Sequence, residues 1–281
     1  MQNLTSNWEV SALVRQWRRD GDRIGFVPTM GNLHEGHLRL VKAAQQNTDR
    51  VVVSIYVNPT QFGQHDDLAN YPRTLEKDLQ KLANLKVDLV FNPSNETMYP
   101  EGNAVCSHVE VPAQLTEGLE GAHRQNHFRG VATVVTKLFN IVAPDVAVFG
   151  EKDFQQLLVV QQMVKDFNLP IEIIGEPTVR EGDGLALSSR NQYLSKQERV
   201  IAPKLYEVLS EIRERILMQN MDLTDLEQAA IMQLEQHGFA PDYVAIRDVV
   251  TLAEPDNPTD LLVILAAARL GQTRLIDNLR V

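Results

Sequence analysis

The feature that most constrains the fold is a regular alternation of short β-branched runs with helical patterns, which continues to about residue 175. The apolar runs occupy residues 24–27, 51–57, 87–91, 146–149 and 171–174. Helical patterns follow them at residues 36–46, 71–86, 131–142 and 154–167. Strands that alternate with helices in this way form βαβ units. We therefore expect an α/β fold built on a parallel sheet.

The pattern changes after about residue 180. Two charged helical stretches, residues 196–218 and 223–236, precede strand-like residues 243–247, 262–268 and 274–277, with turns at residues 255–258 and at Gly271. Helices followed by a small antiparallel sheet form an α+β unit. We therefore expect an N-terminal domain of residues 1–181 and a smaller α+β C-terminal domain of residues 182–281.

Residues 92–126 are less regular than their surroundings, because prolines and glycines interrupt them. Within them, only residues 107–111 alternate as a strand does. We expect this segment to form a lid or an interface loop.

Composition narrows the possible partners and location. The net charge is −10, from 27 Lys and Arg against 37 Asp and Glu, and no run is rich in basic residues. Such a chain repels a phosphate backbone, so nucleic acid is not an expected partner. Cys106 is the only cysteine, which excludes an internal disulfide and fits a reducing cytoplasm. The longest apolar stretch, residues 261–268, is far shorter than the roughly 20 residues that a membrane helix needs.

The most informative segment is residues 28–37, which follow an apolar run and open a helix. Ligands of open α/β sheets bind at the carboxyl ends of the strands. A helix N-terminus there presents unpaired N–H groups and the positive end of its dipole to an anion. His34 and His37 are three residues apart, so both can project toward the same phosphate. Gly36 between them lets a base or ribose approach the backbone.

Other interpretations of this segment are possible. Gly31 and Gly36 are spaced as in a P-loop, but His37 and Leu38 stand where that motif requires Lys and Ser or Thr. The glycine-rich dinucleotide fingerprint is missing as well. Two histidines at a helix start can be metal ligands, surface residues or phosphate donors. No nearby Cys or further His completes a zinc site, which favours phosphate donors.

Gly150, Glu151, Lys152 and Asp153 repeat this arrangement, since they follow the apolar run at residues 146–149 and precede a helix. Two loops at the ends of neighbouring strands can face one ligand across a crevice. Lys and Asp at a helix start are nonetheless more often a solvated cap. From the residues alone, both interpretations stay open.

Two further groups of polar residues suit a site for an acid and a phosphate. Gln61 and Gln156 can hold a hydroxy acid without titrating near neutral pH, although each can equally be an ordinary surface glutamine. Ser188, Ser189 and Arg190 supply two hydroxyls and a permanent cation in consecutive positions. A turn cap and a salt bridge are the simpler explanation of those three residues.

The chain resembles one known family in blocks that extend over nearly its whole length. Residues 34–37 resemble the His-x-Gly-His signature of the nucleotidyltransferase superfamily, which includes class I aminoacyl-tRNA synthetases. The wider string at residues 28–38 is similar to the version in the pantothenate synthetase family. Further blocks of that family follow in order at residues 57–62, 71–74, 127–131, 149–156, 183–191 and 273–278. The chain departs at Thr60, where Met is expected in many members and which can reshape the acid pocket.

This resemblance implies a Rossmann-like N-terminal domain that binds ATP and pantoate, and a C-terminal domain that closes as a lid. It implies condensation of (R)-pantoate with β-alanine through a pantoyl adenylate, with Mg²⁺ accompanying ATP, in a cytoplasmic homodimer. The catalytic residues that it implies are His37, His34 and Lys152. The ATP contacts that it implies are Met30, Gly31, Asn32, Leu33, His34, Glu35, Gly36, His37, Gly150, Glu151, Lys152, Asp153, Val179, Leu187, Ser188, Ser189 and Arg190.

The resemblance also assigns the acid and the amine. Gln61 and Gln156 are expected to bind pantoate, and Gln61 also lies near β-alanine. It names no direct Mg²⁺ ligand. Arg129 is either a further anion contact or a surface charge.

Other functions share parts of this pattern. The closest alternative is a nucleotidylyltransferase of the same superfamily, which transfers a nucleotide to a phosphate and forms no amide. A non-catalytic nucleotide sensor would bind ATP without producing AMP. A tRNA-charging enzyme is disfavoured, because the acidic charge and the small second domain offer no evident RNA surface.

Overall fold

The computed structural model describes residues 1–63, 68–218, 222–255 and 261–281. The chain forms two compact units. The first unit comprises Met1–Pro112, Arg124–Glu151 and Gln156–Pro177, and the second comprises Ala113–His123, Lys152–Gln155 and Thr178–Val281.

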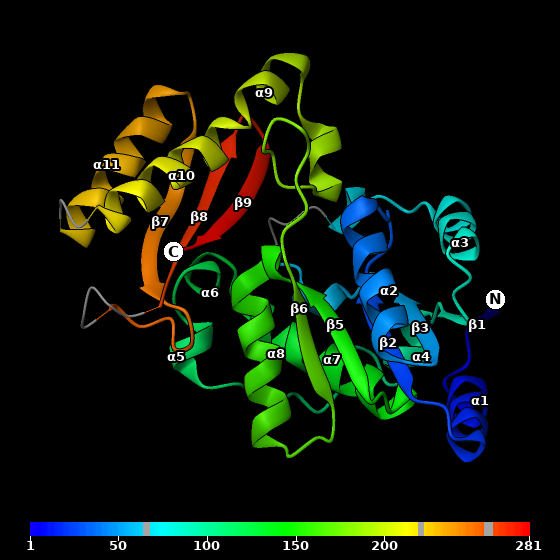
Figure 1. Cartoon of the computed structure of the whole chain (residues 1–281). Coiled ribbons are helices and arrows are strands. Elements are labelled where there is room, and N and C mark those ends of the chain that lie inside the picture. The colour runs from blue at the N-terminus through cyan, green and yellow to red at the C-terminus, as the bar shows by residue number, and fades with distance from the viewer. Residues whose placement is uncertain (64–67, 219–221, 256–260) are drawn as a thin grey trace. The chain divides into compact units, whose positions relative to one another are not determined.

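The first unit contains a parallel sheet of six strands (Figure 1). In the sheet, the strands lie in the order β1, β4, β3, β2, β5, β6, and every neighbouring pair is parallel. The strands predicted near residues 24, 51, 87, 146 and 171 are confirmed, and a short first strand joins them. The bounds are β1 Gln2–Leu4, β2 Ile24–Thr29, β3 Arg50–Ile55, β4 Leu89–Phe91, β5 Val146–Gly150 and β6 Glu172–Glu176.

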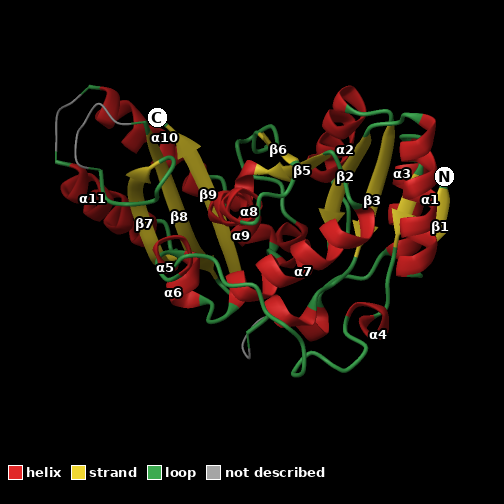
Figure 2. Cartoon of the chain, turned by 90° about the horizontal axis from the view of Figure 1, so that it is seen from below, coloured by secondary structure: helices red, strands yellow, loops and turns green. Residues whose placement is uncertain are grey.

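Helices cover both faces of this sheet, because successive side chains of a strand point to opposite faces. Val27 and Val148 pack with the apolar residues of α2 and α3. Their neighbours Phe26 and Phe149 contact Phe139 of α7, with ring centroids 6.2 Å and 6.5 Å apart. α2 and α7 therefore cover opposite faces (Figure 2). The bounds are α1 Asn7–Asp20, α2 Glu35–Asn47, α3 Leu75–Asn84, α7 His127–Val142 and α8 Phe154–Asp166.

The second unit contains the predicted antiparallel sheet, in the order β7, β8, β9, with helices packed on it. The helix expected at residues 196–218 is wrong as one element, because it is broken at Ala202 and Pro203, and proline has no N–H for the helix ladder. The turn at Gly271 is confirmed, and residues 256–258 of the other predicted turn lie outside the described residues. The bounds are α9 Lys196–Ile201, α10 Lys204–Leu217, α11 Leu223–Gln236, β7 Ala240–Asp248, β8 Leu262–Leu270 and β9 Thr273–Arg280.

The irregular segment at residues 92–126 contains three short helices: α4 Asn95–Met98, α5 Ala113–Thr116 and α6 Glu120–His123. The strand predicted at residues 107–111 is wrong, because these residues pair with no strand of the described chain. Instead, the Val109 N–H donates a hydrogen bond to the Thr133 hydroxyl of α7 at 3.0 Å. An alternating pattern is not sufficient for a strand, because the backbone also needs a neighbouring strand to pair with.

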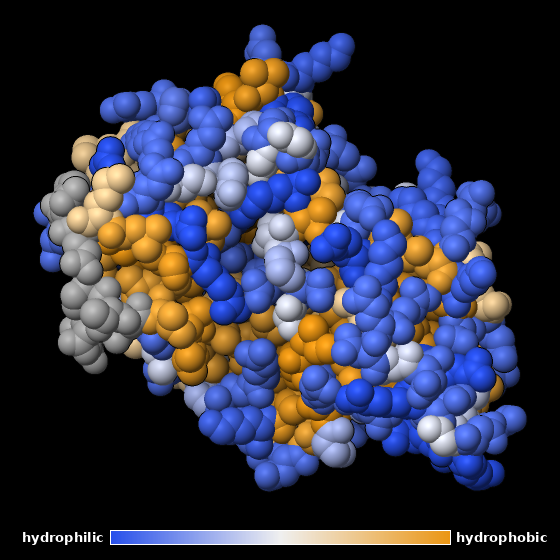
Figure 3. Space-filling model, viewed as in Figure 1, coloured by the Kyte–Doolittle hydropathy of each residue, from blue (hydrophilic) through white to orange (hydrophobic). Residues whose placement is uncertain are grey.

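Hydrophilic residues make up most of the molecular face in Figure 3. Within the described ranges, no helix is both long and apolar enough to cross a membrane.

Gly130 allows α7 to approach the short helix η1 Pro59–Gln61, which follows β3. A Cβ atom on Gly130 would lie 2.5 Å from the Thr60 carbonyl oxygen and 2.7 Å from the Gln61 nitrogen. Both contacts are with backbone, which cannot swing aside as a flexible side chain can.

We predict that Gly130→Ala lowers the free energy of unfolding by about 1–3 kcal/mol, the usual cost of overpacking. Alanine in place of glycine inside a helix otherwise stabilises by about 1 kcal/mol. Urea unfolding measures the change, with Gly118→Ala as a control because no atom lies within 4 Å of its Cβ position. Equal or greater stability of Gly130→Ala would contradict this close packing.

Candidate active site

The loop after β2 is held by a buried carboxylate of α3. Gly31 and Asn32 have positive φ angles of 81° and 49°. These turn the Asn32 and Leu33 N–H groups toward Asp78, whose two oxygens each accept one of them at 2.8 Å. Asp78 is fully buried, and Lys81, one turn further along α3, donates to the Leu33 carbonyl. Side chains of α3 thus form hydrogen bonds with two backbone N–H groups and one carbonyl of this loop.

His34 and His37 lie side by side at the N-terminus of α2, with ring centroids 4.1 Å apart. The His37 Nδ1 atom accepts a hydrogen bond from the His34 backbone N–H at 3.2 Å. A neutral imidazole that accepts at Nδ1 carries its proton on Nε2. The second nitrogen of His37 is therefore a donor, as a group that binds phosphate must be.

The loop after β3 reaches the loop after β2 through Gln61. The Gln61 Nε2 group contacts the Met30 sulfur at 3.4 Å. Its Oε1 atom accepts from the Asn58 side chain at 3.1 Å, and that Asn58 amide also donates to the Gly130 carbonyl at 3.2 Å. Asn58 thereby fixes the orientation of the Gln61 amide. Gln61 presents its N–H donors, rather than its oxygen, on the side toward Met30.

Two hydroxyl groups complete the shell around Asn58. The Tyr99 hydroxyl and the Thr60 hydroxyl donate to the Asn58 side-chain oxygen, each at 3.0 Å. Burial raises the pKa of the Tyr99 phenol, so this hydroxyl keeps its proton at neutral pH. Thr60 stands where the family resemblance predicts Met, and its hydroxyl makes a bond to Asn58 that a thioether cannot donate.

His127 supports the backbone of the same loop. Its Nδ1 atom lies 2.8 Å from the Gln61 carbonyl oxygen, so it must be the donor. The other ring nitrogen, Nε2, lies 3.1 Å from the Arg124 guanidinium. Arg129 forms an exposed ion pair with Glu110. Of the two interpretations of Arg129, this contact favours a surface charge.

The other residues predicted in the first unit have varied surroundings. Glu35 is exposed and pairs with Lys42 at 3.1 Å. Gly150 ends β5, which is the neighbour of β2 in the sheet, so the loops with Met30 and with Glu151 follow adjacent strands. Gln156 lies half-buried in the first turn of α8.

In the second unit, the predicted ATP contacts lie on one hairpin and on two short helices, η3 Glu151–Asp153 and η4 Ser189–Tyr193. Val179 and Leu187 face each other across the hairpin, since the Leu187 N–H donates to the Val179 carbonyl at 2.9 Å. The Ser188 hydroxyl accepts from the Arg190 backbone N–H at 3.2 Å, as an N-cap does. Lys152 lies in η3.

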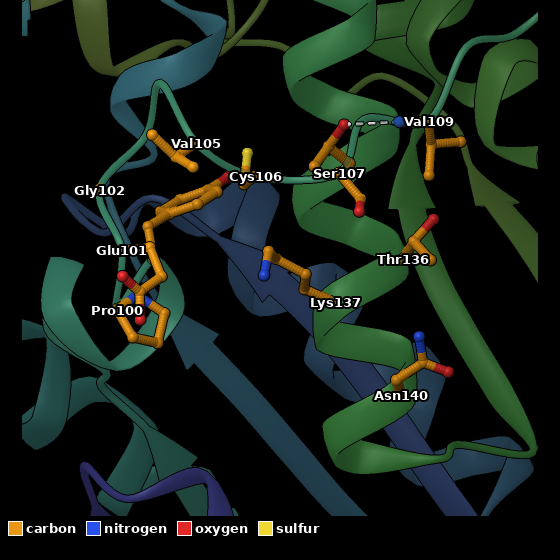
Figure 4. A pocket seen from close by; sticks show the side chains of 12 residues that line it. Pro100, Glu101, Gly102, Val105, Cys106, Ser107, Val109, Thr136, Lys137 and Asn140 are labelled. Atoms are coloured by element: carbon orange, nitrogen blue, oxygen red, sulfur yellow. Dashed lines mark hydrogen bonds between the residues drawn. The ribbon is translucent and has the colours of Figure 1, made fainter.

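A pocket of about 350 Å³ lies between residues 99–109 and α7 (Figure 4). Lys137 points into it from α7, and its Nζ atom lies 5.1 Å from the centre of the Tyr99 ring. None of the predicted site residues lines this pocket. Tyr99 connects it to the site, because its ring forms part of the wall while its hydroxyl reaches Asn58.

Among the residues that the structure describes, no group of three or more His, Cys, Asp or Glu side chains could hold a metal ion.

The sequence prediction missed Asp78, Asn58 and Tyr99. A signal for Asp78 exists: it lies among Leu75, Leu79 and Leu82 at helical spacing, so a charge falls on the apolar stripe of a helix. A carboxylate placed there must find buried partners. The role of Asn58 depends on its contacts with residues distant in sequence, and no local pattern reveals those.

The family model and the most similar sequences point to one family. A family model described as pantoate-beta-alanine ligase matches residues 2–280. A pantothenate synthetase from Pseudomonas fluorescens is 56% identical over 271 residues, which cover 96% of this chain and 94% of that protein. One from Pseudomonas aeruginosa is 55% identical over 274 residues, covering 97% and 96%.

Solved structures agree. The crystal structure of pantothenate synthetase from Thermus thermophilus is 45% identical, has a TM-score of 0.92 and covers 99% of both chains. The structure of pantoate-beta-alanine ligase from Francisella tularensis, complexed with beta-gamma ATP and beta-alanine, is 37% identical with a TM-score of 0.84. It covers 100% of this chain and 97% of that one.

We predict that Asp78→Asn destabilises the loop after β2. An amide nitrogen would face one of the two N–H groups that now bond to the carboxylate, leaving a buried donor unsatisfied at a cost of about 1–3 kcal/mol. Thermal unfolding and the KM for ATP should both change, with a lower melting temperature and a higher KM.

Asp49→Asn serves as the control for Asp78→Asn. Asp49 also accepts a backbone N–H, that of Arg23 at 2.8 Å, but the contact is exposed and distant in sequence from the loop. If Asp78→Asn kept the melting temperature and the KM for ATP of the unchanged protein, the hydrogen bonds from the loop to Asp78 would have no role in the site.

Proposed function

The chain belongs to the pantoate–β-alanine ligase family, and we propose that His34 and His37 act on the phosphates of ATP while Gln61 and Gln156 hold the acid. The reaction is the ATP-dependent condensation of (R)-pantoate with β-alanine to pantothenate, AMP and pyrophosphate. The observation that carries this function is the family match over residues 2–280.

The chemistry needs an activated acid, because a carboxylate oxygen is a poor leaving group. A pantoate carboxylate oxygen attacks the α-phosphorus of ATP, and the bond to pyrophosphate breaks. The β-alanine amine then attacks the carbonyl carbon of the pantoyl adenylate, AMP leaves and the nitrogen loses a proton. Catalysis consists mainly of positioning and charge stabilisation.

His34 and His37 are proposed to donate hydrogen bonds to phosphate oxygens as charge builds up. The Nδ1 contact of His37 supports this role, since it leaves the proton on Nε2. The helix N-terminus beneath both rings favours negative charge. The departing pyrophosphate is proposed to be held by Lys152, Ser188, Ser189 and Arg190. The other ATP contacts that the family resemblance implies are likewise proposed to bind ATP.

Gln61 is proposed to bind pantoate through its amide N–H groups. Asn58 supports this polarity, because its donor occupies the Gln61 oxygen. A neutral donor binds a carboxylate or hydroxyl oxygen of the acid without titrating near neutral pH. Gln156 is proposed as the second pantoate contact, and Gln61 also as the neighbour of β-alanine, the amine present in the Francisella tularensis complex.

The metal ion, the oligomeric state, the location and the roles of the two domains are proposals as well. Mg²⁺ enters with ATP and is held chiefly by phosphate oxygens, as is usual for this cation. The protein works as a homodimer in the cytoplasm. The first 181 residues supply most of the substrate contacts, and residues 182–281 act as the lid.

The function is tested by AMP formation with ATP, pantoate and β-alanine, each omitted in turn. We predict that AMP requires both the acid and the amine for turnover, and that His37→Ala lowers the rate of pantoate-dependent ATP–pyrophosphate exchange by about 10²–10³, as for loss of an oxyanion donor.

The matched control is His237→Ala, a histidine at the C-terminus of α11. This variant should keep normal exchange. AMP or pyrophosphate release without any amide product would instead favour a nucleotidylyltransferase, and near-normal exchange by His37→Ala would remove His37 from the mechanism.

A further inference from the structure

Strand β9, the red strand of Figure 1, carries a buried ion pair that the proposed chemistry does not use. Arg180 donates to both oxygens of Asp277, at 2.6 Å and 2.9 Å. Asp277 is 4% exposed, and the guanidinium also stacks on the Tyr206 ring at 3.8 Å. A bidentate pair with aromatic support is a rigid arrangement.

This ion pair fixes the backbone of the next residue, Asn278. The Asn278 N–H donates to an Asp277 oxygen at 2.8 Å, and its carbonyl accepts from Arg180 at 3.1 Å. Across the sheet, Asn278 pairs with Leu265 of β8. The backbone on both sides of the Asn278 side chain is therefore immobilised.

The Asn278 side chain uses this support to hold Lys152. Its amide nitrogen donates to the Lys152 carbonyl oxygen at 2.9 Å, and Asn278 is 6% exposed. Because a carbonyl oxygen can only accept, the amide orientation is determined. A residue at the far C-terminal end of the chain thus holds the backbone of a residue 126 positions earlier.

Arg180 connects the same support to the hairpin that leads to Ser188. It also donates to the Gly184 carbonyl at 3.1 Å, and it pairs with Ala186 across the hairpin. One ion pair therefore lies next to both segments that are proposed to contact pyrophosphate. Burial raises the pKa of the Asp277 carboxyl, while Arg180 and Lys152 both act in the opposite direction.

We propose that Asn278, held by the Arg180–Asp277 pair, is a positioning residue that aims Lys152 at the phosphates of ATP. This inference rests on the proposed function, since Lys152 has a target only if ATP binds there. In this proposal Asn278 touches no substrate and acts through Lys152. Its effect on the reaction should therefore vanish when the Lys152 side chain is absent.

A double-mutant cycle tests this dependence. Asn278→Ala is measured in the unchanged protein and in Lys152→Ala, by pantoate-dependent ATP–pyrophosphate exchange. In the unchanged background, we expect kcat to fall by about 10- to 100-fold, the effect of a small misplacement, with the KM for pantoate unchanged. In the Lys152→Ala background, the same substitution should change kcat less than about twofold, since the coupled effect is already lost.

Two further variants distinguish a positioning role of Asn278 from a general loss of stability. Asn278→Asp removes the N–H donor at nearly constant shape and carries the test if Asn278→Ala does not fold. Arg247→Gln removes an ion pair of the same unit, to Glu227 at 2.8 Å, that touches neither Lys152 nor the hairpin. It should lower the melting temperature and leave exchange unchanged.

Equal losses from Asn278→Ala in both backgrounds, or no loss in the unchanged one, would overturn the positioning role. These outcomes are distinct from failure of the proposed function, in which the unchanged protein shows no exchange with pantoate at all.

Discussion

The site depends first on how the backbone of the loop after β2 is satisfied. The positive φ angles of Gly31 and Asn32 turn the N–H groups of Asn32 and Leu33 away from solvent. Such donors are costly when they are buried without a partner. Asp78 supplies both acceptors. Because these two hydrogen bonds fix the residues immediately before α2, they also fix the position of the start of α2, where His34 and His37 lie. Thus α3, which contributes none of the predicted ligand contacts, holds the backbone that leads into the two histidines.

A second constraint has the same form in each unit. Asn58 orients Gln61 from within the first unit, and Asn278 holds Lys152 from within the second. Each asparagine is buried, and each uses its amide to fix the geometry of a residue proposed to bind a substrate. Side chains that touch ligands keep one geometry only when neighbours limit their freedom. We accordingly interpret these two buried asparagines as supports of the site.

Sequence patterns predicted the parallel sheet well, because its buried strands are continuous apolar runs between helices, as at residues 146–149. They predicted the histidine pair for a similar reason, since three-residue spacing at a helix start is a local property. They did not reveal that residues 113–123 and 152–155 belong to the second unit. Glu120 shows why: it pairs with Arg274, 154 positions later, and such contacts leave no periodic trace. The roles proposed for the site residues stay predictions.

The proposed reaction depends on one arrangement, in which the α-phosphate of ATP lies against the imidazoles of His34 and His37 while pantoate faces it from the side of Gln61. A crystal structure with pantoate and an ATP analogue that cannot release pyrophosphate tests this directly. We predict an imidazole Nε2 within hydrogen-bond distance of a phosphate oxygen, and the pantoate carboxylate in line with the α-phosphorus. A nucleotide bound elsewhere, with both imidazoles against protein groups, would contradict the account.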